Sequence, residues 1–303
     1  MTNETEKSSM PLPTPLAEQS KINEPAPVDG NPLAHYFRHP KVQIELPTGG
    51  NFWPEGSVEL IEGKYLDVMP MTARDEIIMK SPEGLLNGTS IVTTIASCIP
   101  GIKDPWVIPA HDVDTILIAI RLASYEHELA VTTNCTHCNH VNDDKIDLRV
   151  MLDGIPKGQI KNVFQVDELT FELKPYTFRF MNANSKAKFD QERLAKSIVD
   201  SQLSEIERKE YFEDMFRKLA DHNEETLVQA IHRIIMPDGS YVANKEQIAE
   251  FVSNASRNMV DDIRNIMRQM NQTAAIQPTT FTCEECEKEY TRNIEFNQSN
   301  FFE

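Results

Sequence analysis

The chain has 303 residues, 40% hydrophobic and 25% charged, which is ordinary for a folded protein of one large or two smaller domains. Its 47 acidic and 30 basic residues give a formal net charge of −17, which repels a phosphate backbone. We therefore expect protein partners and no direct nucleic-acid partner. No apolar run approaches the roughly 20 residues of a membrane span, and no signal-peptide pattern opens the sequence, so its thiols should stay reduced in a cytoplasm.

Residues 1–33 are rich in proline and poor in apolar residues, which predicts a disordered arm or a segment that orders against a partner. Residues 34–152 should form an α+β domain. In it, "VQIEL" alternates like a strand, and "SVELI" and "YLDVM" flank the turn Glu62-Gly63-Lys64 as in a hairpin.

Three helices are expected in this domain. Thr72, followed three residues later by Asp75, gives the capping-box pattern of a short helix. A second helix should follow Gly88 and bury Cys98 as a structural thiol. The third spans "HDVDTILIAIRLASYEHEL", with Asp112 as its N-cap.

Residues 153–278 are expected to be mostly helical, after two strands in "ELTFELKPYTFRF" around Lys174-Pro175. "NEETLVQAIHRII" places its apolar residues at helical spacing, and Asn244 can cap "KEQIAEFVS". "NMVDDIRNIMRQM" carries a methionine-rich stripe, which is typical of a helix-packing face and would be a docking surface if uncovered.

Four of the five cysteines form two CxxC pairs, Cys135 with Cys138 and Cys283 with Cys286. In both pairs an isoleucine follows eight residues after the second cysteine, within alternating residues. This repeat predicts two β-hairpin knuckles that hold one structural Zn²⁺ per chain through four thiolates, as in a zinc ribbon. The usual interval between pairs is about 15–20 residues. Here the ribbon would be split by the helical region, with residues 279–303 as its C-terminal half, because loop-closure entropy grows only logarithmically.

Two other interpretations of the pairs stay open. A redox pair normally lies at the start of a helix, whereas both pairs here lead into strand-like alternation. The pairs could also be unrelated surface turns. His137 and His140 could act as ligands, but four thiolates already complete a shell, so we expect them on the surface. A left-handed turn after the second cysteine would suit Asn139 better than Glu287.

No catalytic motif appears in the sequence. A Walker-type phosphate loop, a dinucleotide-binding GxGxxG, a GxSxG elbow and an HExxH helix are all missing. The histidines are scattered, and carboxylates are numerous enough to pair by chance. We therefore expect no enzyme and assign no catalytic residue.

Four stretches, taken together and in order, resemble the baseplate hub protein family of T-even-type contractile-tailed bacteriophages. They are "IELPTGGNFWPEGSVELI", "VMPMTARDEIIMKSPEGLLNGTSIVTTIASCI", "DVDTILIAIRLASYEHELAVTTNCTHC" and "FTCEECEKEYTRNIEFNQSNFF". The matching features are Pro70 to Thr72 with Asp75 and Glu76, Leu85 to Gly88, Ala119 to Arg121, Tyr125, and Cys135 with Cys138. This chain has Glu126 where the family pattern has glycine.

The resemblance implies a non-enzymatic virion protein of the tail baseplate or its hub, made in the host cytoplasm during assembly. It would bind other tail proteins such as hub, wedge or tape-measure components. Because similar proteins are either hub subunits or hub assembly factors, a transient assembly chaperone absent from the mature virion is the alternative. A zinc-ribbon protein of nucleic-acid processing is a third possibility, which the net charge opposes.

Overall fold

The computed structural model describes residues 31, 33, 36–158, 160–199, 205–273, 275–294 and 301–302. The chain divides into two compact units, residues 1–37 and 38–303, and the elements below belong to the second. The arm expected at residues 1–33 lies outside the described residues apart from Asn31 and Leu33, so it stays a prediction. The described residues combine helices with small antiparallel sheets, which confirms the α+β class.

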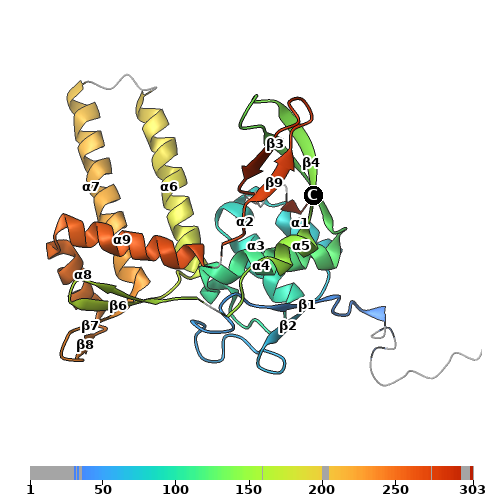
Figure 1. Ribbon diagram of the computed structural model, residues 1–303, viewed down its shortest axis with the longest axis horizontal. Helices are drawn as coiled ribbons and strands as arrows, with labels where there is room; N and C mark the ends of the chain where they lie inside the picture. Colours follow the sequence, from blue (N-terminus) through green and yellow to red (C-terminus); the bar gives the residue numbers. More distant parts are fainter. Residues whose placement is uncertain are drawn as a thin grey trace, which may run out of the picture. The chain divides into compact units, whose positions relative to one another are not determined.

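The first hydrophobic core is organised around a buried central helix. Its elements are β1 (Val42–Glu45), β2 (Tyr65–Val68), α1 (Ala73–Met79), α2 (Pro82–Leu86), α3 (Thr89–Cys98), the 3₁₀ helix Pro105–Val107, α4 (Ala110–Ser124), β3 (Glu128–Asn134), β4 (Val141–Asp147) and α5 (Leu148–Asp153) (Figure 1). Ile116, Ile118 and Ile120 of α4 are all fully buried, although Ile118 lies on the side of the helix opposite the other two. Helix α4 is therefore surrounded by the rest of this core.

Two of the three predicted helix starts are confirmed. Thr72 Oγ1 accepts a hydrogen bond from the Asp75 N–H, and the Asp75 carboxylate accepts one from the Thr72 N–H, which completes the capping box of α1. Helix α3 begins after Gly88 and buries Cys98. The N-cap prediction for Asp112 is wrong, because α4 begins earlier and Asp112 lies buried within its first turn.

The strand pairing near the start of the domain also differs from the prediction. Strand β1 pairs with β2, so that Ile44 lies opposite Leu66 and both side chains are buried. The segment "SVELI" makes only isolated bridges, and its Ile61 is 42% exposed. The pairing that buries apolar residues on both strands is the one that forms.

The strand-like alternation that follows the first cysteine pair ends earlier than its pattern indicates, within "KIDLRVML". The Asp147 side chain accepts a hydrogen bond from the Arg149 N–H at 2.9 Å, so that Asp147 is the N-cap of α5. Helix α5 then buries Leu148, Met151 and Leu152 on one face. An aspartate at the strand end therefore converts the alternation into a helix start.

The second hydrophobic core lies within residues 160–270. Its elements are β5 (Val163–Val166), β6 (Leu169–Leu173), α6 (Phe178–Val199), α7 (Glu205–Ala230), β7 (Ile231–Ile235), β8 (Tyr241–Val242), α8 (Lys245–Asn254) and α9 (Arg257–Gln272). The strands form one antiparallel sheet in the order β5-β6-β7-β8. Met267 and Met270 are buried, so the methionine stripe of α9 is a packing face, as expected.

Two segments of this region differ from the prediction. Residues 231–235, expected to end a helix, form β7, because pairing with β6 buries Ile231 and Ile234 on the sheet. The second strand expected in "ELTFELKPYTFRF" is instead the start of α6, after Pro175, which cannot donate to a ladder. The prediction for Asn244 is confirmed, since its side chain accepts from the first N–H groups of α8. None of the helices within the described ranges is long and apolar enough to cross a membrane.

Candidate metal centre

The first cysteine pair lies in the loop that joins β3 to β4. The Cys135 N–H donates to the His140 carbonyl at 2.8 Å, and the Asn139 N–H donates to the Cys135 carbonyl at 3.1 Å. Asn139 has a φ of 59°, the left-handed conformation expected after the second cysteine. These bonds form a tight knuckle that turns both sulfurs to one side.

The second cysteine pair repeats this backbone in the hairpin of β9 (Thr279–Thr282) and β10 (Glu289–Arg292). The Cys283 N–H donates to the Lys288 carbonyl at 3.0 Å, and the Glu287 N–H donates to the Cys283 carbonyl at 3.0 Å. Glu287 has a φ of 56°, although its side chain makes this conformation unfavourable. The two predicted hairpins therefore exist and have matching knuckles.

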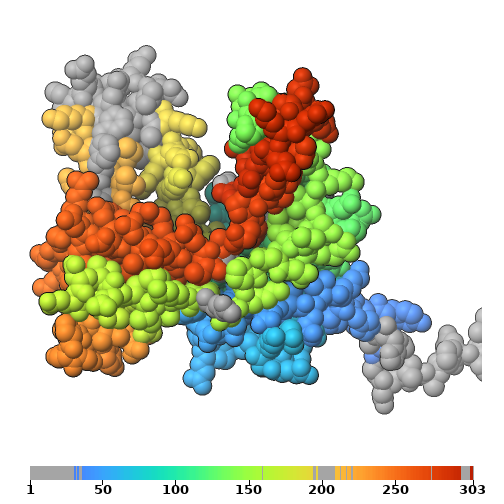
Figure 2. Space-filling view, in the orientation of Figure 1, coloured from blue at the N-terminus to red at the C-terminus, as the bar shows by residue number. Residues whose placement is uncertain are grey.

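The two knuckles meet. Cys135 Sγ lies 3.7 Å from Cys286 Sγ, and Cys138 Sγ lies 3.5 Å from Cys283 Sγ. All four sulfurs lie within 4.8 Å of one another. A tetrahedral zinc site with Zn–S bonds of about 2.3 Å has S–S edges of about 3.8 Å. The cysteine cluster thus has dimensions that fit one metal ion, and Figure 2 shows the C-terminal hairpin in red lying against the green residues of the first hairpin.

The sulfurs of the cluster differ in their affinity for protons. Burial raises the pKa of Cys283, but N–H groups of Cys286 and Glu285 and the neighbouring thiols outweigh burial and lower this pKa to about 6. The N–H of His140 lowers the pKa of Cys138, but burial and the other thiols outweigh that bond and raise it to about 12. Because metals bind thiolates, metal binding to this cluster should release protons.

Polar side chains connect the two hairpins around the cluster. Asn142 is fully buried, donates to the His140 carbonyl at 3.2 Å and accepts from the Glu284 N–H at 2.9 Å. Thr133 Oγ1 and the Tyr290 hydroxyl form a further hydrogen bond of 2.6 Å. Asn142 therefore supports both knuckles at once, as outer-shell groups of metal sites do.

The candidate histidine ligands lie outside the cluster, as expected. His137 is exposed and its Nε2 lies 3.1 Å from the Glu289 carbonyl, while His140 takes part through its backbone. The role of Asn142 was not predicted. Its signal was a polar residue on the inward face of β4, four residues before the buried Ile146.

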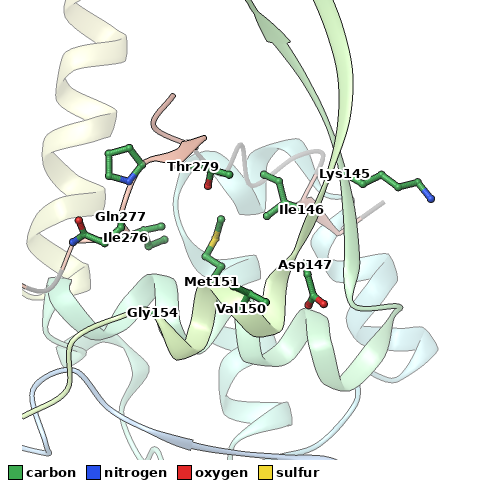
Figure 3. A pocket seen from close by; sticks show the side chains of 10 residues that line it. Lys145, Ile146, Asp147, Val150, Met151, Gly154, Ile276, Gln277 and Thr279 are labelled. Carbon is green, nitrogen blue, oxygen red and sulfur yellow. The ribbon is translucent and has the colours of Figure 1, made fainter. Parts of the chain in front are cut away.

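A cavity of about 370 Å³ lies at the end of β4 that is away from the cysteine knuckle, where residues 276–279 lie against β4 and α5 (Figure 3). Ile146 and Met151 point toward it, and Lys145 extends away from it. Lys145 and Asp147 are its ionisable lining residues, and both form ion pairs at the surface. The cavity is therefore a mostly apolar gap between residues 276–279 and the segment formed by β4 and α5.

A second contact joins the end of the described chain to the first core. Phe301 and Phe302 are 3% and 6% exposed. The buried Arg121 of α4 donates to the Phe301 carbonyl, and its guanidinium lies 5.4 Å from the Phe301 ring centroid. The Tyr125 hydroxyl donates to the Phe302 carbonyl at 3.2 Å. Residues 301–302 are thus held by α4 through contacts that include none of the four sulfurs.

Fold and cluster together define an α+β protein in which two cysteine knuckles from distant parts of the chain come together. The sequence profile of the family described as T4 bacteriophage base plate protein matches residues 58–303. The chain belongs to this family, and it is a baseplate protein of T4-like phages. Comparison with curated proteins and with solved structures gives no match.

Proposed function

We propose that this protein is a non-enzymatic structural subunit of the contractile-tail baseplate or its hub, stabilised by one Zn²⁺ per chain. Cys135, Cys138, Cys283 and Cys286 would be the ligands. The observation that carries the proposal is the convergence of four sulfurs within 4.8 Å in a member of a baseplate family. Four thiolates fill a tetrahedral shell and leave no position for a substrate, so the zinc would be structural.

In this proposal, residues 34–152 and 279–303 form one zinc-bearing domain, and residues 153–278 are inserted into it. The composition of the two cores supports this division, with Ile155 and Phe178 as the buried residues of the inserted range that join the first core. The first core unites Ile146 with Phe281 and Tyr290, which lie beyond the insertion. The second core contains only residues from 164 to 270 among its buried members. The metal would then close the domain around the two ends of its insertion.

The partners would be other tail proteins, such as hub, wedge or tape-measure components. The protein would be made in the host cytoplasm and would remain in the virion tail. Its net charge of −17 opposes direct binding to nucleic acid. A hub assembly factor that leaves before maturation is the alternative role, and it would use the same fold.

The zinc site is tested by measuring the metal content of purified protein. We expect one zinc per chain, loss of that zinc in Cys135→Ser and in Cys283→Ser, and a lower unfolding temperature after chelation, because binding is coupled to folding. Cys98→Ala is the matched control, since Cys98 lies outside the cluster and should leave the zinc content unchanged. A full zinc complement in either serine variant would show that the site is not shared.

The structural role is tested by a mass-spectrometric inventory of purified tails. A subunit of the baseplate should be present at a fixed ratio to the other baseplate proteins. Presence in complexes from infected cells combined with absence from mature tails would support the assembly factor and overturn the structural subunit.

A further inference from the structure

Residues 47–54 form a loop that is held in place by a buried carboxylate. Asp112 is fully buried in α4. It accepts hydrogen bonds from the Thr48 N–H at 2.9 Å, from Thr48 Oγ1 at 2.6 Å and from Trp53 Nε1 at 2.7 Å. The Asn51 N–H closes the turn by donating to the Thr48 carbonyl at 3.1 Å. Both ends of the loop are therefore fixed to the central helix.

The residue between these fixed points has an unfavourable backbone conformation. Phe52 has a φ of 68°, in the left-handed region that bulky residues avoid. Its side chain belongs to neither hydrophobic core. Packing in the interior thus does not account for a phenylalanine here. Strained residues of this kind persist where the surroundings hold them, and they gather at binding sites.

Phe52 lines a pocket of about 310 Å³. Its lining residues are Phe52, Trp53 and Pro54 from the loop, and Glu172, Leu173, Lys174 and His232 from the β6–β7 region. This volume lies at the lower end of the range for ligand pockets and suits one large side chain. Because the loop is already fixed, an occupant would not have to order it.

The charged residues that line the pocket are Glu172 and Lys174, and within the described ranges only the carboxylate has an ion-pair partner. Glu172 is neutralised by Arg233, whose Nε lies 2.5 Å from its Oε2. Lys174 forms no ion pair with another described residue. Burial, and then the charge of Lys174, lower the pKa of the nearby Lys245 to about 8. An occupant that brings a carboxylate to Lys174 would relieve this repulsion.

We propose that this pocket is a docking site for an acidic segment of another baseplate protein. The segment would insert one aromatic side chain against Phe52 and Trp53 and place a neighbouring carboxylate beside Lys174. Offset or edge-to-face packing of rings and a charge-assisted hydrogen bond would supply the recognition. The partner class rests on the proposed baseplate function. The pocket contains none of the four cysteines, so the docking test can fail while the zinc prediction holds, and the reverse.

The two tryptophans of the chain allow a direct measurement. Trp53 lines the pocket, whereas Trp106 packs against Phe178 and Arg179 elsewhere, so its indole signal is an internal reference. The probe is the synthetic peptide Gly-Glu-Phe-Glu-Gly, titrated into ¹⁵N-labelled full-length protein. Of the two indole N–H signals, we expect that of Trp53 to shift saturably and that of Trp106 to stay in place. Replacing the phenylalanine of the peptide by alanine, or its glutamates by lysines, should weaken binding at least tenfold.

Variants of the protein separate docking from folding. Phe52→Gly should fold with unchanged zinc content, because glycine adopts a positive φ without strain, but it should bind the peptide at least tenfold more weakly. Lys174→Glu should have the same effect on binding. Lys80→Glu changes an exposed lysine that does not line the pocket, and it should bind like the natural protein.

Four results would overturn the proposal. The first is the lack of a saturable Trp53 shift, and the second is undiminished peptide binding by a correctly folded Phe52→Gly variant. The third is a concentration-dependent self-association that Phe52→Gly abolishes, which would assign the pocket to a second copy of this chain. The fourth is displacement of the bound peptide by a DNA oligonucleotide as effectively as by unlabelled peptide, which would count against a protein partner.

Discussion

Replacing Phe301 by alanine tests whether residues 301–302 are part of the first core. Phe301 is 3% exposed, its ring meets Phe302 edge to face at 5.0 Å, and the Arg121 guanidinium lies over it. Truncation of a buried phenylalanine to alanine costs about 3–5 kcal/mol. We expect the free energy of unfolding to fall by about 3 kcal/mol, which is a decrease of roughly 150-fold in the folding equilibrium constant. At a frayed chain end the same change would cost almost nothing.

The assay is urea unfolding of the zinc-loaded protein, with the midpoint shifted and the slope unchanged. Phe189→Ala is the matched control, because Phe189 is 47% exposed and its loss should cost less than about 0.5 kcal/mol. A loss below about 1 kcal/mol in Phe301→Ala would refute the docking of this residue. A double-mutant cycle with Arg121→Met should give a coupling of about 1 kcal/mol, whereas additivity within about 0.5 kcal/mol would show that their contact carries little energy.

Two further predictions concern single residues. Burial raises the pKa of Asp112 to about 6 despite its bonds to Thr48 and Trp53, while an unfolded aspartate titrates near 3.9. The folded state therefore favours the protonated Asp112 carboxyl. The stabilisation from this group is complete below about pH 4 and falls by about 3 kcal/mol as the pH rises past 6. The unfolding free energy of the natural protein minus that of Asp112→Asn should decline over this interval, and a flat difference would contradict the shift. Glu287→Gly should raise the stability of the metal-loaded protein by up to about 1 kcal/mol, since glycine relieves the left-handed strain, whereas Glu285→Gly, which is not at a positive φ, should give no gain in the same melting experiment.

The features that could be predicted from the sequence depend on residues close together in the chain. The capping box of Thr72 and Asp75 and the cap at Asn244 are complete within a few residues, so their patterns were sufficient. The cysteine cluster is the exception, since its halves lie far apart. It could be predicted because the same local CxxC pattern occurs twice, and a tetrahedral metal site needs the two ligands of each copy.

The features that were missed depend on distant partners. Residues 231–235 contain apolar residues compatible with either a helix or a strand, and β6 decides between them. Asp112 has the local features of an N-cap, yet its actual donors, Thr48 and Trp53, lie about sixty positions earlier. Nothing near Phe52 in the sequence shows that β6 and β7 complete its pocket. Local chemistry thus fixed the elements, while the pairing of elements determined the functional surfaces.

The cysteine cluster and the contact at Phe301 support each other through chain entropy. The cluster joins residues 151 positions apart, and the Arg121–Phe301 bond spans 180 positions. Once the sulfurs of Cys283 and Cys286 are held against the first hairpin, only the short segment up to Phe301 remains to be closed, so docking of Phe301 costs much less entropy. Because coupling between two binding events is reciprocal, docking of Phe301 must strengthen metal binding by the same factor. Phe301→Ala should therefore weaken zinc binding although it removes no ligand, while Phe189→Ala should leave it unchanged. Equal zinc affinities in the two variants would show that the two contacts act separately.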